Sequence, residues 1–588
     1  MIRLPALRRL CATVTPAKAA LLSVLLSLPA LGVGYQIDDW QQQVLIRADA
    51  GAALTEMFTF MDPDRNAVLR EAGVLPWWTP PEAQARFFRP LSAATHLLDH
   101  AVAPGSAVVA HLHSLLWAGA LVWAAGLLLV RVLGRRSAAV AGLAVLLYAV
   151  DDAHGMPVGW LANRNALIAG VLGISAVLAH IRSREDGWRP GGLLSPLLLL
   201  AGLLAGESAL AATAWLAAHA LTLDRAPLVP RLRALLPAGV VVVGWRIAYN
   251  LMGYGSAGSG LYLDPVASPV AFLRALPVRL SALLADQFLG LPSLTLSFVE
   301  PSVQRLVLVL VVPALGWALW RLSVLLRSDA TARFWAAGLL LSALPICATF
   351  PAARLLTFVG IGGAAIVAMA AERVLWTPGG EALRGRGVVS ALLGLHLLVA
   401  PLMLPVQAGG VRVIADTLIN LCHDAIPTSP DIVNKTVVFV NANELCVGQA
   451  LPQRAIRGGP SPRAVRLLAS AHYDLEVQAL DRHTIEISIA GGMQSVDADT
   501  LMQPANTPLP IGSVVPLSDM RVEVVGWSAA GRVDRIRVQT NAPLDDPSMV
   551  WVVARDAQLQ LVDAPSPGTT WRLPGVFTWL SPWSPTER

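Results

Sequence analysis

The sequence predicts a mainly α-helical, polytopic membrane protein with a small C-terminal β-rich domain outside the membrane. Of its 588 residues, 55% are hydrophobic and only 14% are charged, whereas a soluble domain carries about 25% charged residues. Apolar runs long enough to cross a bilayer recur along most of the chain. From about residue 430 the pattern changes to short β-branched segments, typical of strands, at 435–442, 483–490, 521–527, 535–540 and 549–556.

The basic residues predict the orientation of the spans, because Lys and Arg gather on the cytoplasmic side of membrane proteins. Arg3, Arg8, Arg9 and Lys18 precede the first apolar run, so residues 1–18 are predicted to be cytoplasmic. The ALG at 30–32 leaves a cleaved signal peptide as an alternative. About eleven spans place every basic cluster on the same side, within a transmembrane domain at 19–406: 19–36, 106–130, 137–150, 160–181, 191–205, 208–223, 234–252, 303–320, 334–350, 355–371 and 388–406.

Several segments are predicted to lie outside the membrane. The first external loop, 38–105, is long and partly irregular around its Pro- and Trp-rich stretch at 76–81. Residues 269–300 are interrupted by charges and favour an interfacial or re-entrant helix. A linker at 407–429 leads to the β-rich domain at 430–588, so the protein is predicted in a cell (inner) membrane with an extracytoplasmic C-terminal domain. Cys422 and Cys446 lie on the oxidising side, and the sequence leaves open whether they pair.

Ionisable residues from at least six spans gather at the predicted outer surface. Charged groups at the edge of a span are costly and usually face a shared cavity, so we expect a site for an anionic ligand beside an acid/base carboxylate. Simpler interpretations remain: a solvated helix end for the acidic pair, an exposed turn for Glu207, and a structural role for Arg164 and Arg246. The residues are Asp38, Asp39, Arg89, His96, His111, His113, Asp151, Asp152, His154, Arg164, Glu207, Arg246 and Arg354.

Other kinds of site are not indicated. The four cysteines form no CxxC pair, which argues against a zinc site or a redox dithiol. His111 and His113 are two residues apart and point to different sides of a helix. The loop GYGSAGSG at 253–260 lacks the GK[ST] of a P-loop and is interpreted as flexible. No nucleic-acid motif and no cofactor are predicted, and a divalent metal is possible but not indicated.

An ordered set of short motifs carries a resemblance to a known family. The acidic pair Asp38–Asp39 follows the first span, and RPL stands at 89–91 in the first external loop. AHLHSLLW (110–117), AHGMPVGWLANRNALIAG (153–170) and ESA (207–209) follow in order. Across about 20–370 the chain resembles the GT-C superfamily of integral-membrane glycosyltransferases. It is most similar to the bacterial relatives of the transmembrane O-mannosyltransferases with tetratricopeptide repeats.

This resemblance implies a donor sugar carried on a polyprenyl phosphate, an acceptor of unknown kind (protein, lipid or glycan), and membrane lipid as surroundings. It implies that Asp38 or Asp39 is the catalytic base, the other orienting an arginine or the acceptor. Base catalysis is what an inverting transfer requires, and arginine forks suit the phosphate. The donor phosphate would be held by Arg89, Arg354 and Arg164, with His96, His154, Asp151, Glu207 and Arg246 in support.

The chain also departs from that family. Relatives have a histidine where Asp151 stands, a glutamate where Met156 stands and a lysine where Gly206 stands, and no tetratricopeptide repeats follow. These differences leave the acceptor and the activity open. A transporter or flippase of a lipid-linked solute is one alternative, although we detect no inverted repeat of the kind that transporters show. A non-catalytic scaffold with the same fold is another.

Overall fold

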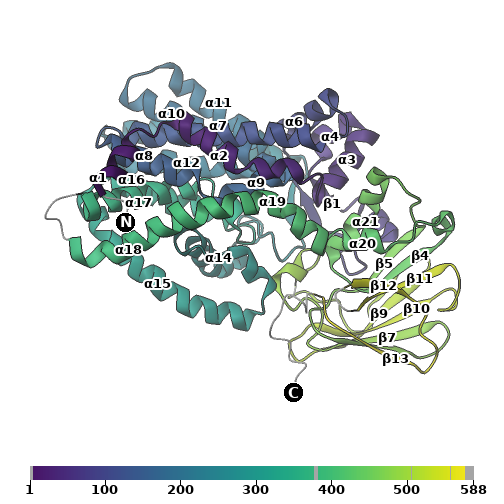
Figure 1. Ribbon diagram of the computed structural model, residues 1–588. Helices are drawn as coiled ribbons and strands as arrows, with labels where there is room; N and C mark the ends of the chain where they lie inside the picture. Colours follow the sequence, from purple (N-terminus) through teal and green to yellow (C-terminus); the bar gives the residue numbers. More distant parts are fainter. Residues whose placement is uncertain (1–3, 377–381, 505, 556–557, 577–588) are drawn as a thin grey trace.

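A bundle of apolar helices and a separate pair of β-sheets make up the computed structural model (Figure 1), which describes residues 4–376, 382–504, 506–555 and 558–576. The predicted fold class, a helical membrane part followed by a β-rich domain, is confirmed. The helices up to residue 418 are α1 (Leu4–Ala12), α2 (Pro16–Leu26), α3 (Asp38–Ala48), α4 (Ala50–Glu56), α5 (Asn66–Ala72), α6 (Pro90–Val102), α7 (Ala107–Leu133), α8 (Ala138–Ala149), α9 (Gly155–Gly159), α10 (Arg164–Glu185), α11 (Pro190–Ala205), α12 (Ala211–Thr222), α13 (Leu228–Leu251), α14 (Pro269–Leu289), α15 (Pro301–Ser328), α16 (Ala330–Ile346), α17 (Val359–Ala371), α18 (Ala382–Gly394) and α19 (Ala400–Leu418).

Six helices in the described part of the chain are long and apolar enough to cross a membrane, or eight if two bent pairs each count as one span. One of these pairs, α1 with α2, bends by 99°. The bend falls where Pro16 opens α2, because proline is favoured in the first turn of a helix and not in its interior. The chain is therefore a multi-pass membrane protein. The total of eleven spans stays a prediction, since α11 and α16 are shorter apolar helices and the predicted span 208–223 forms only the 12-residue α12.

The segment 407–429, predicted as a linker, is largely helical in the structure. Residues 407–418 continue α19, which follows α18 through a π-helical turn at Leu395–Val399. Ala408, Val411 and Ala415 are buried on one face of α19, while Arg412 and Asp416 form an exposed ion pair at 3.4 Å. This amphipathic pattern keeps the segment helical despite Pro405 and the two glycines at 409–410.

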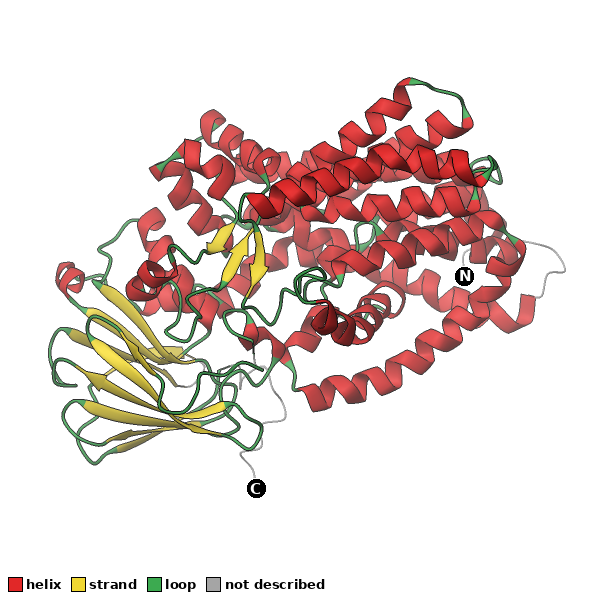
Figure 2. Ribbon diagram, turned by 180° about the vertical axis from the view of Figure 1, so that it is seen from behind, coloured by secondary structure: helices red, strands yellow, loops and turns green. Residues whose placement is uncertain are grey.

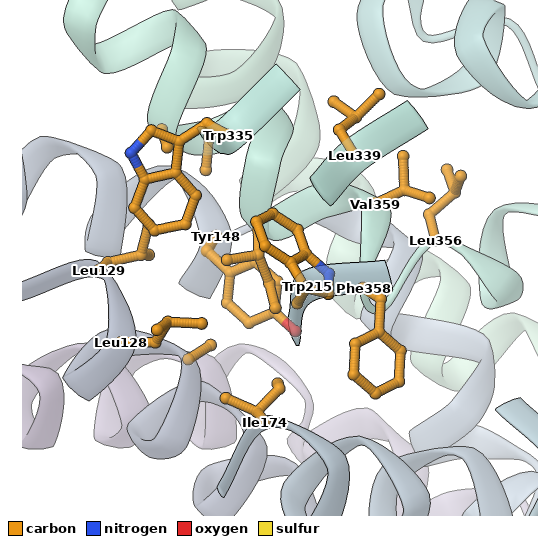
Figure 3. Packing of buried hydrophobic residues seen from close by; sticks show 14 of the residues in the cluster. Leu128, Leu129, Tyr148, Ile174, Trp215, Trp335, Leu339, Leu356, Phe358 and Val359 are labelled. Atoms are coloured by element: carbon orange, nitrogen blue, oxygen red, sulfur yellow. The ribbon is translucent and has the colours of Figure 1, made fainter. Parts of the chain in front are cut away.

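Aromatic and aliphatic side chains pack in the core of the helical part (Figure 3). The ring of Trp215 lies 5.4 Å from Phe334 and 5.6 Å from Trp335, centroid to centroid. Gly338 allows this contact, because a Cβ there would stand 2.2 Å from the Trp215 ring. This close approach packs α12 directly against α16.

The first external loop folds into short helices around a small sheet of three strands. These strands are β1 (Thr59–Met61), β2 (Gln84–Arg86) and β3 (Gly255–Ala257), paired in that order. Figure 2 shows this sheet where the helical part meets the C-terminal sheets. β3 lies within GYGSAGSG and pairs antiparallel with β2. The glycine-rich segment is therefore anchored, which corrects its interpretation as a flexible loop.

The C-terminal domain contains two sheets and one long helix. Each of the five predicted strand segments contains a strand, and the helix α21 (Glu444–Arg457) crosses between the parallel strands β4 and β5. The four-stranded sheet has the order β12-β11-β4-β5, and the six-stranded antiparallel sheet has the order β13-β6-β7-β10-β9-β8. The strands are β4 (Thr436–Asn441), β5 (Ala464–Ala469), β6 (Leu475–Ala479), β7 (Thr484–Ile489), β8 (Val514–Pro516), β9 (Met520–Trp527), β10 (Val533–Thr540), β11 (Met549–Arg555), β12 (Gln558–Val562) and β13 (Thr570–Leu573).

The first external loop is docked on this domain through side chains that reach across from it. Trp77 Nε1 donates to the carbonyl of Leu468 at 3.0 Å, and Trp78 Nε1 donates to Glu444 Oε1 at 3.1 Å. Both indole rings are buried in the hydrophobic core of the C-terminal domain. A disulfide between Cys422 and Cys446 joins α20 (Leu421–Ala425) to α21, so the pairing that the sequence left open is formed.

Candidate functional site

A cavity of about 240 Å³ lies where the first external loop, the helical part and the C-terminal domain meet. Asp38 and Trp160 line it from the helical part, and Arg354 lines it from η6, a 3₁₀ turn at Ala353–Leu355. Tyr262 enters from the loop after β3, and Glu444 from α21. The cavity therefore gathers charged groups from segments that lie far apart in the sequence, from Asp38 to Asp499.

Asp38 stands at the first residue of α3, where a helix N-terminus favours a negative charge. The preceding residue, Ile37, has a φ of 52°, a rare conformation for a β-branched residue that costs about 1–3 kcal/mol. Among the described residues, the Asp38 carboxylate has no hydrogen-bond or ion-pair partner. Burial raises the pKa of Asp38 to about 6, while the positive charges of Arg354 and Arg89 act to lower it. Such a group changes its protonation near neutral pH.

Asp39 occupies a different environment. Its side chain is buried, and its oxygens accept hydrogen bonds from the backbone N–H of Gln36 at 2.9 Å and of Ala162 at 2.7 Å. Burial raises the pKa of Asp39 to about 8, against the lowering effect of these two donors. Asp39 fastens α3 to the turn before α10, so it contacts neither an arginine nor the cavity, contrary to the predicted orienting role.

Arg354 is held by aromatic faces. Its guanidinium carbon lies 5.2 Å from the ring centroid of Phe350 and 5.5 Å from that of Trp160. Cation–π contacts of this kind attract the charge and leave the N–H groups free to donate. No ion pair or hydrogen bond involves the Arg354 side chain in the described part of the protein. Its fork is available to an anion in the cavity.

Arg89 stands at the N-terminus of α6 and is paired with Glu207. Its Nη2 and Nε lie 2.7 and 2.8 Å from Glu207 Oε2, and Tyr249 donates to the other carboxylate oxygen at 3.2 Å. The ring of Phe87 lies 4.7 Å from the guanidinium carbon. Glu207 is thus more than an exposed turn residue. It holds Arg89, whose positive charge acts to lower the pKa of Asp38.

Arg164 differs from the predicted phosphate-binding role, and we leave it out of that set. Its side chain is fully buried. It donates to Asp99 Oδ2 at 2.5 Å, to Ser114 Oγ at 2.9 Å and to the carbonyl of Ala110 at 2.6 Å. These partners lie on α6 and α7, so Arg164 joins three helices, which is the structural alternative that the sequence left open.

The remaining predicted site residues also lie outside the cavity. Asp151 accepts from the backbone N–H of Ala153 at 3.1 Å, and His154 contacts the carbonyl of Tyr148 at 2.8 Å through Nε2. Arg246 pairs with Asp264 at 2.5 Å. His96 is buried in α6, and burial lowers its pKa well below the usual value. In the described ranges, no three His, Cys, Asp or Glu side chains gather as metal ligands.

The polar lining residues that the sequence did not reveal include Tyr262, Glu444 and Asp499. Tyr262 was missed because the preceding glycine-rich stretch was interpreted as a flexible loop. Glu444 and Asp499 line the cavity from the C-terminal domain, and their segments resemble ordinary polar loops in the sequence. Only the docking of that domain onto the first external loop brings them to the site.

No protein-family model and no curated protein matches the chain. Solved structures with a similar arrangement include the archaeal oligosaccharyltransferase AglB from Archaeoglobus fulgidus, in complex with an inhibitory peptide and a dolichol-phosphate. Its identity is 12% and its TM-score 0.40, over 74% of this chain and 63% of AglB. ArnT from Cupriavidus metallidurans, bound to undecaprenyl phosphate, is 13% identical with a TM-score of 0.34, over 72% of this chain and 89% of ArnT.

The arabinosyltransferase EmbB from Mycobacterium smegmatis is 13% identical with a TM-score of 0.32, over 97% of this chain and 64% of EmbB. The chain thus spans less than two thirds of the length of AglB and of EmbB. Residue roles below rest on the geometry of this chain alone.

Proposed function

We propose that the protein is a membrane glycosyltransferase that moves a sugar from a polyprenyl-phosphate donor to an acceptor hydroxyl at the extracytoplasmic face. One observation carries the proposal: Asp38 and Arg354 line the same cavity, and among the described residues neither side chain has a hydrogen-bond or ion-pair partner. A carboxylate and a free arginine fork are the two groups that this transfer requires.

The chemistry assigns one role to each group. Asp38 accepts the proton of the acceptor hydroxyl as its oxygen forms a bond to the anomeric carbon. The bond from that carbon to the phosphate oxygen breaks on the opposite side, which inverts the configuration. Polyprenyl phosphate leaves with the extra negative charge, and Arg354 stabilises that charge, aided by Arg89 from its pairing with Glu207.

The extracytoplasmic location has separate support. A disulfide joins Cys422 to Cys446 beside the cavity, and stable disulfides are typical of oxidising compartments. The distribution of basic residues along the sequence also favours an extracytoplasmic location for this domain.

Replacement of the base tests the proposal. We expect Asp38→Asn to lower sugar transfer in membranes by about 10²- to 10⁴-fold, the usual contribution of a general base, with undecaprenyl phosphate still bound in native mass spectrometry. Asp416→Asn is the matched control, because Asp416 is an exposed carboxylate at the end of α19. Transfer by Asp38→Asn at the parental rate would refute the role of Asp38.

A further inference from the structure

The C-terminal domain forms one end of the cavity, and its lining differs from that of the end that contains Asp38 and Arg354. Glu444, Leu445, Gly448 and Gln449 all line it, and this spacing places them on one face of α21. Asn443 caps that helix by accepting from the backbone N–H of Leu445 at 3.0 Å. Because the cap and the disulfide at Cys446 both fix the first turn, this face of α21 is a rigid wall.

Two side-chain oxygens on this wall have no partner. Glu444 is 5% exposed and Gln449 is 6% exposed. Trp78 occupies one oxygen of Glu444, but Glu444 Oε2 and Gln449 Oε1 have no hydrogen-bond partner among the described residues. A buried polar atom left unpaired costs about 1–3 kcal/mol. Unpaired atoms at a cavity wall are therefore expected where a ligand supplies the missing partners.

The surroundings restrict what that ligand is. Val74, Leu445 and Met502 make this end largely apolar, and Arg354, at the other end, is the sole basic side chain among the described lining residues. An anionic group would thus find no counter-charge here. Burial raises the pKa of Glu444 well above its usual value, and the nearby charge of Asp499 adds to the effect. A neutral Glu444 side chain both donates and accepts hydrogen bonds, which matches hydroxyl groups.

We propose that α21 holds the acceptor, and that the acceptor end bound here is an uncharged, hydroxyl-bearing unit of the sugar or polyol class, recognised by Glu444 and Gln449. The assignment rests on the proposed function, because it takes the Asp38–Arg354 end as the place of reaction. The acceptor then spans from α21 to Asp38, with one hydroxyl at the base.

Photolabelling of the full-length protein in lipid nanodiscs tests this assignment. The probe is an alkyl β-glucoside with a diazirine in its alkyl chain, and the reference is the same chain ending in phosphocholine. We expect the glucoside to label the peptide that contains α21, with competition by unlabelled alkyl glucoside. Equal labelling by both probes would show that the cavity only accepts alkyl chains, which overturns the proposal.

Two substitutions on one helix sharpen the test. Gln449→Met removes the amide at nearly constant length, and we expect about a fivefold to tenfold loss of glucoside labelling, equivalent to one hydrogen bond. Gln453→Met is the matched control: Gln453 is also buried with an unpaired amide, but it does not line the cavity. Equal labelling of the two variants would contradict the assignment.

The readouts separate the two proposals. Undecaprenyl phosphate binding, followed by native mass spectrometry, reports on the Arg354 end and should be unchanged in Gln449→Met. Failure of the parent protein to bind undecaprenyl phosphate would count against the proposed function, whatever the labelling of α21. Normal lipid binding with no sugar-dependent labelling would count against the acceptor site alone.

Discussion

At the scale of single residues, the adjacent carboxylates Asp38 and Asp39 have different environments and different contacts. Asp38 faces the cavity, and Asp39 binds two backbone N–H groups. The sequence predicts that one of the two carboxylates is the base and that the other orients an arginine or the acceptor. It did not predict that Asp39 holds the backbone, because the partner N–H at Ala162 lies 123 residues away.

The raised pKa of Asp38 predicts a pH profile. A base with a pKa of about 6 is ionised above that value, so kcat/KM should rise with pH up to about 6 and then level off. Arg354→Gln removes a positive charge that lowers this pKa, and the rising limb should move to higher pH. Arg354→Lys keeps the charge but loses the fork, so it should weaken donor binding and leave the limb in place. A rising limb that is identical in all three proteins would exclude Asp38 as the titrating group.

At the scale of elements, the polar joint at Arg164 holds the bundle together. The guanidinium joins α10 to α6 and α7 through Asp99 and two further acceptors. Arg164 lies within a predicted span, and charged residues within membranes often have a functional role. The sequence therefore favoured a contact with a ligand. Whether Arg164 binds a ligand or joins helices depends on its partners on α6 and α7. A local sequence pattern does not reveal such partners.

Loss of this joint should be costly. Arg164→Met removes the arginine from the buried Asp99, which retains its contact with His113 Nδ1 at 2.7 Å, and breaking a buried ion pair costs about 3–5 kcal/mol. We expect a clearly lower thermal unfolding temperature in detergent. The control is Arg246→Met, because Arg246 pairs with Asp264 while 31% of its side chain is exposed, and such pairs contribute little. Equal unfolding temperatures for the two variants would contradict the structural role of Arg164.

At the scale of the whole molecule, composition and periodicity predicted the helical part and the β-rich domain. The sequence also indicated the charged residues on the helical side of the cavity, but not those that the C-terminal domain contributes. The apolar runs and the five β-branched segments correspond to helices and strands because burial determines both. Asp38 and Arg354, which line the cavity, were among the residues that the family resemblance implied. The other wall of the cavity depends on Trp77 and Trp78 docking into the C-terminal domain, a contact between distant segments that each satisfy ordinary local patterns.

The topology provides a prediction at this scale. If the first external loop and the C-terminal domain dock as described, both must lie on one side of the membrane, and the charge distribution makes this the outer side. An alkaline phosphatase fused after residue 588 should be active, and one fused at residue 136, in the predicted cytoplasmic turn RVLGRR, should be inactive. An inactive fusion after 588 would overturn the orientation and the assigned face of the site.

The long helical stretch that runs from α18 through α19 to α20 bears on the depth of the proposed reaction. The continuous helical stretch Gly385–Ala425 has 41 residues, about 60 Å at 1.5 Å per residue, whereas the hydrocarbon core measures about 30 Å. Its last turns therefore stand above the acyl chains even when the helix is tilted. Ile414 and Leu418 from these turns line the cavity, so in the proposed reaction the reacting atoms would meet at the height of the lipid headgroups. The proposed donor would then keep its polyprenyl tail in the bilayer while only its phosphate and sugar enter the cavity.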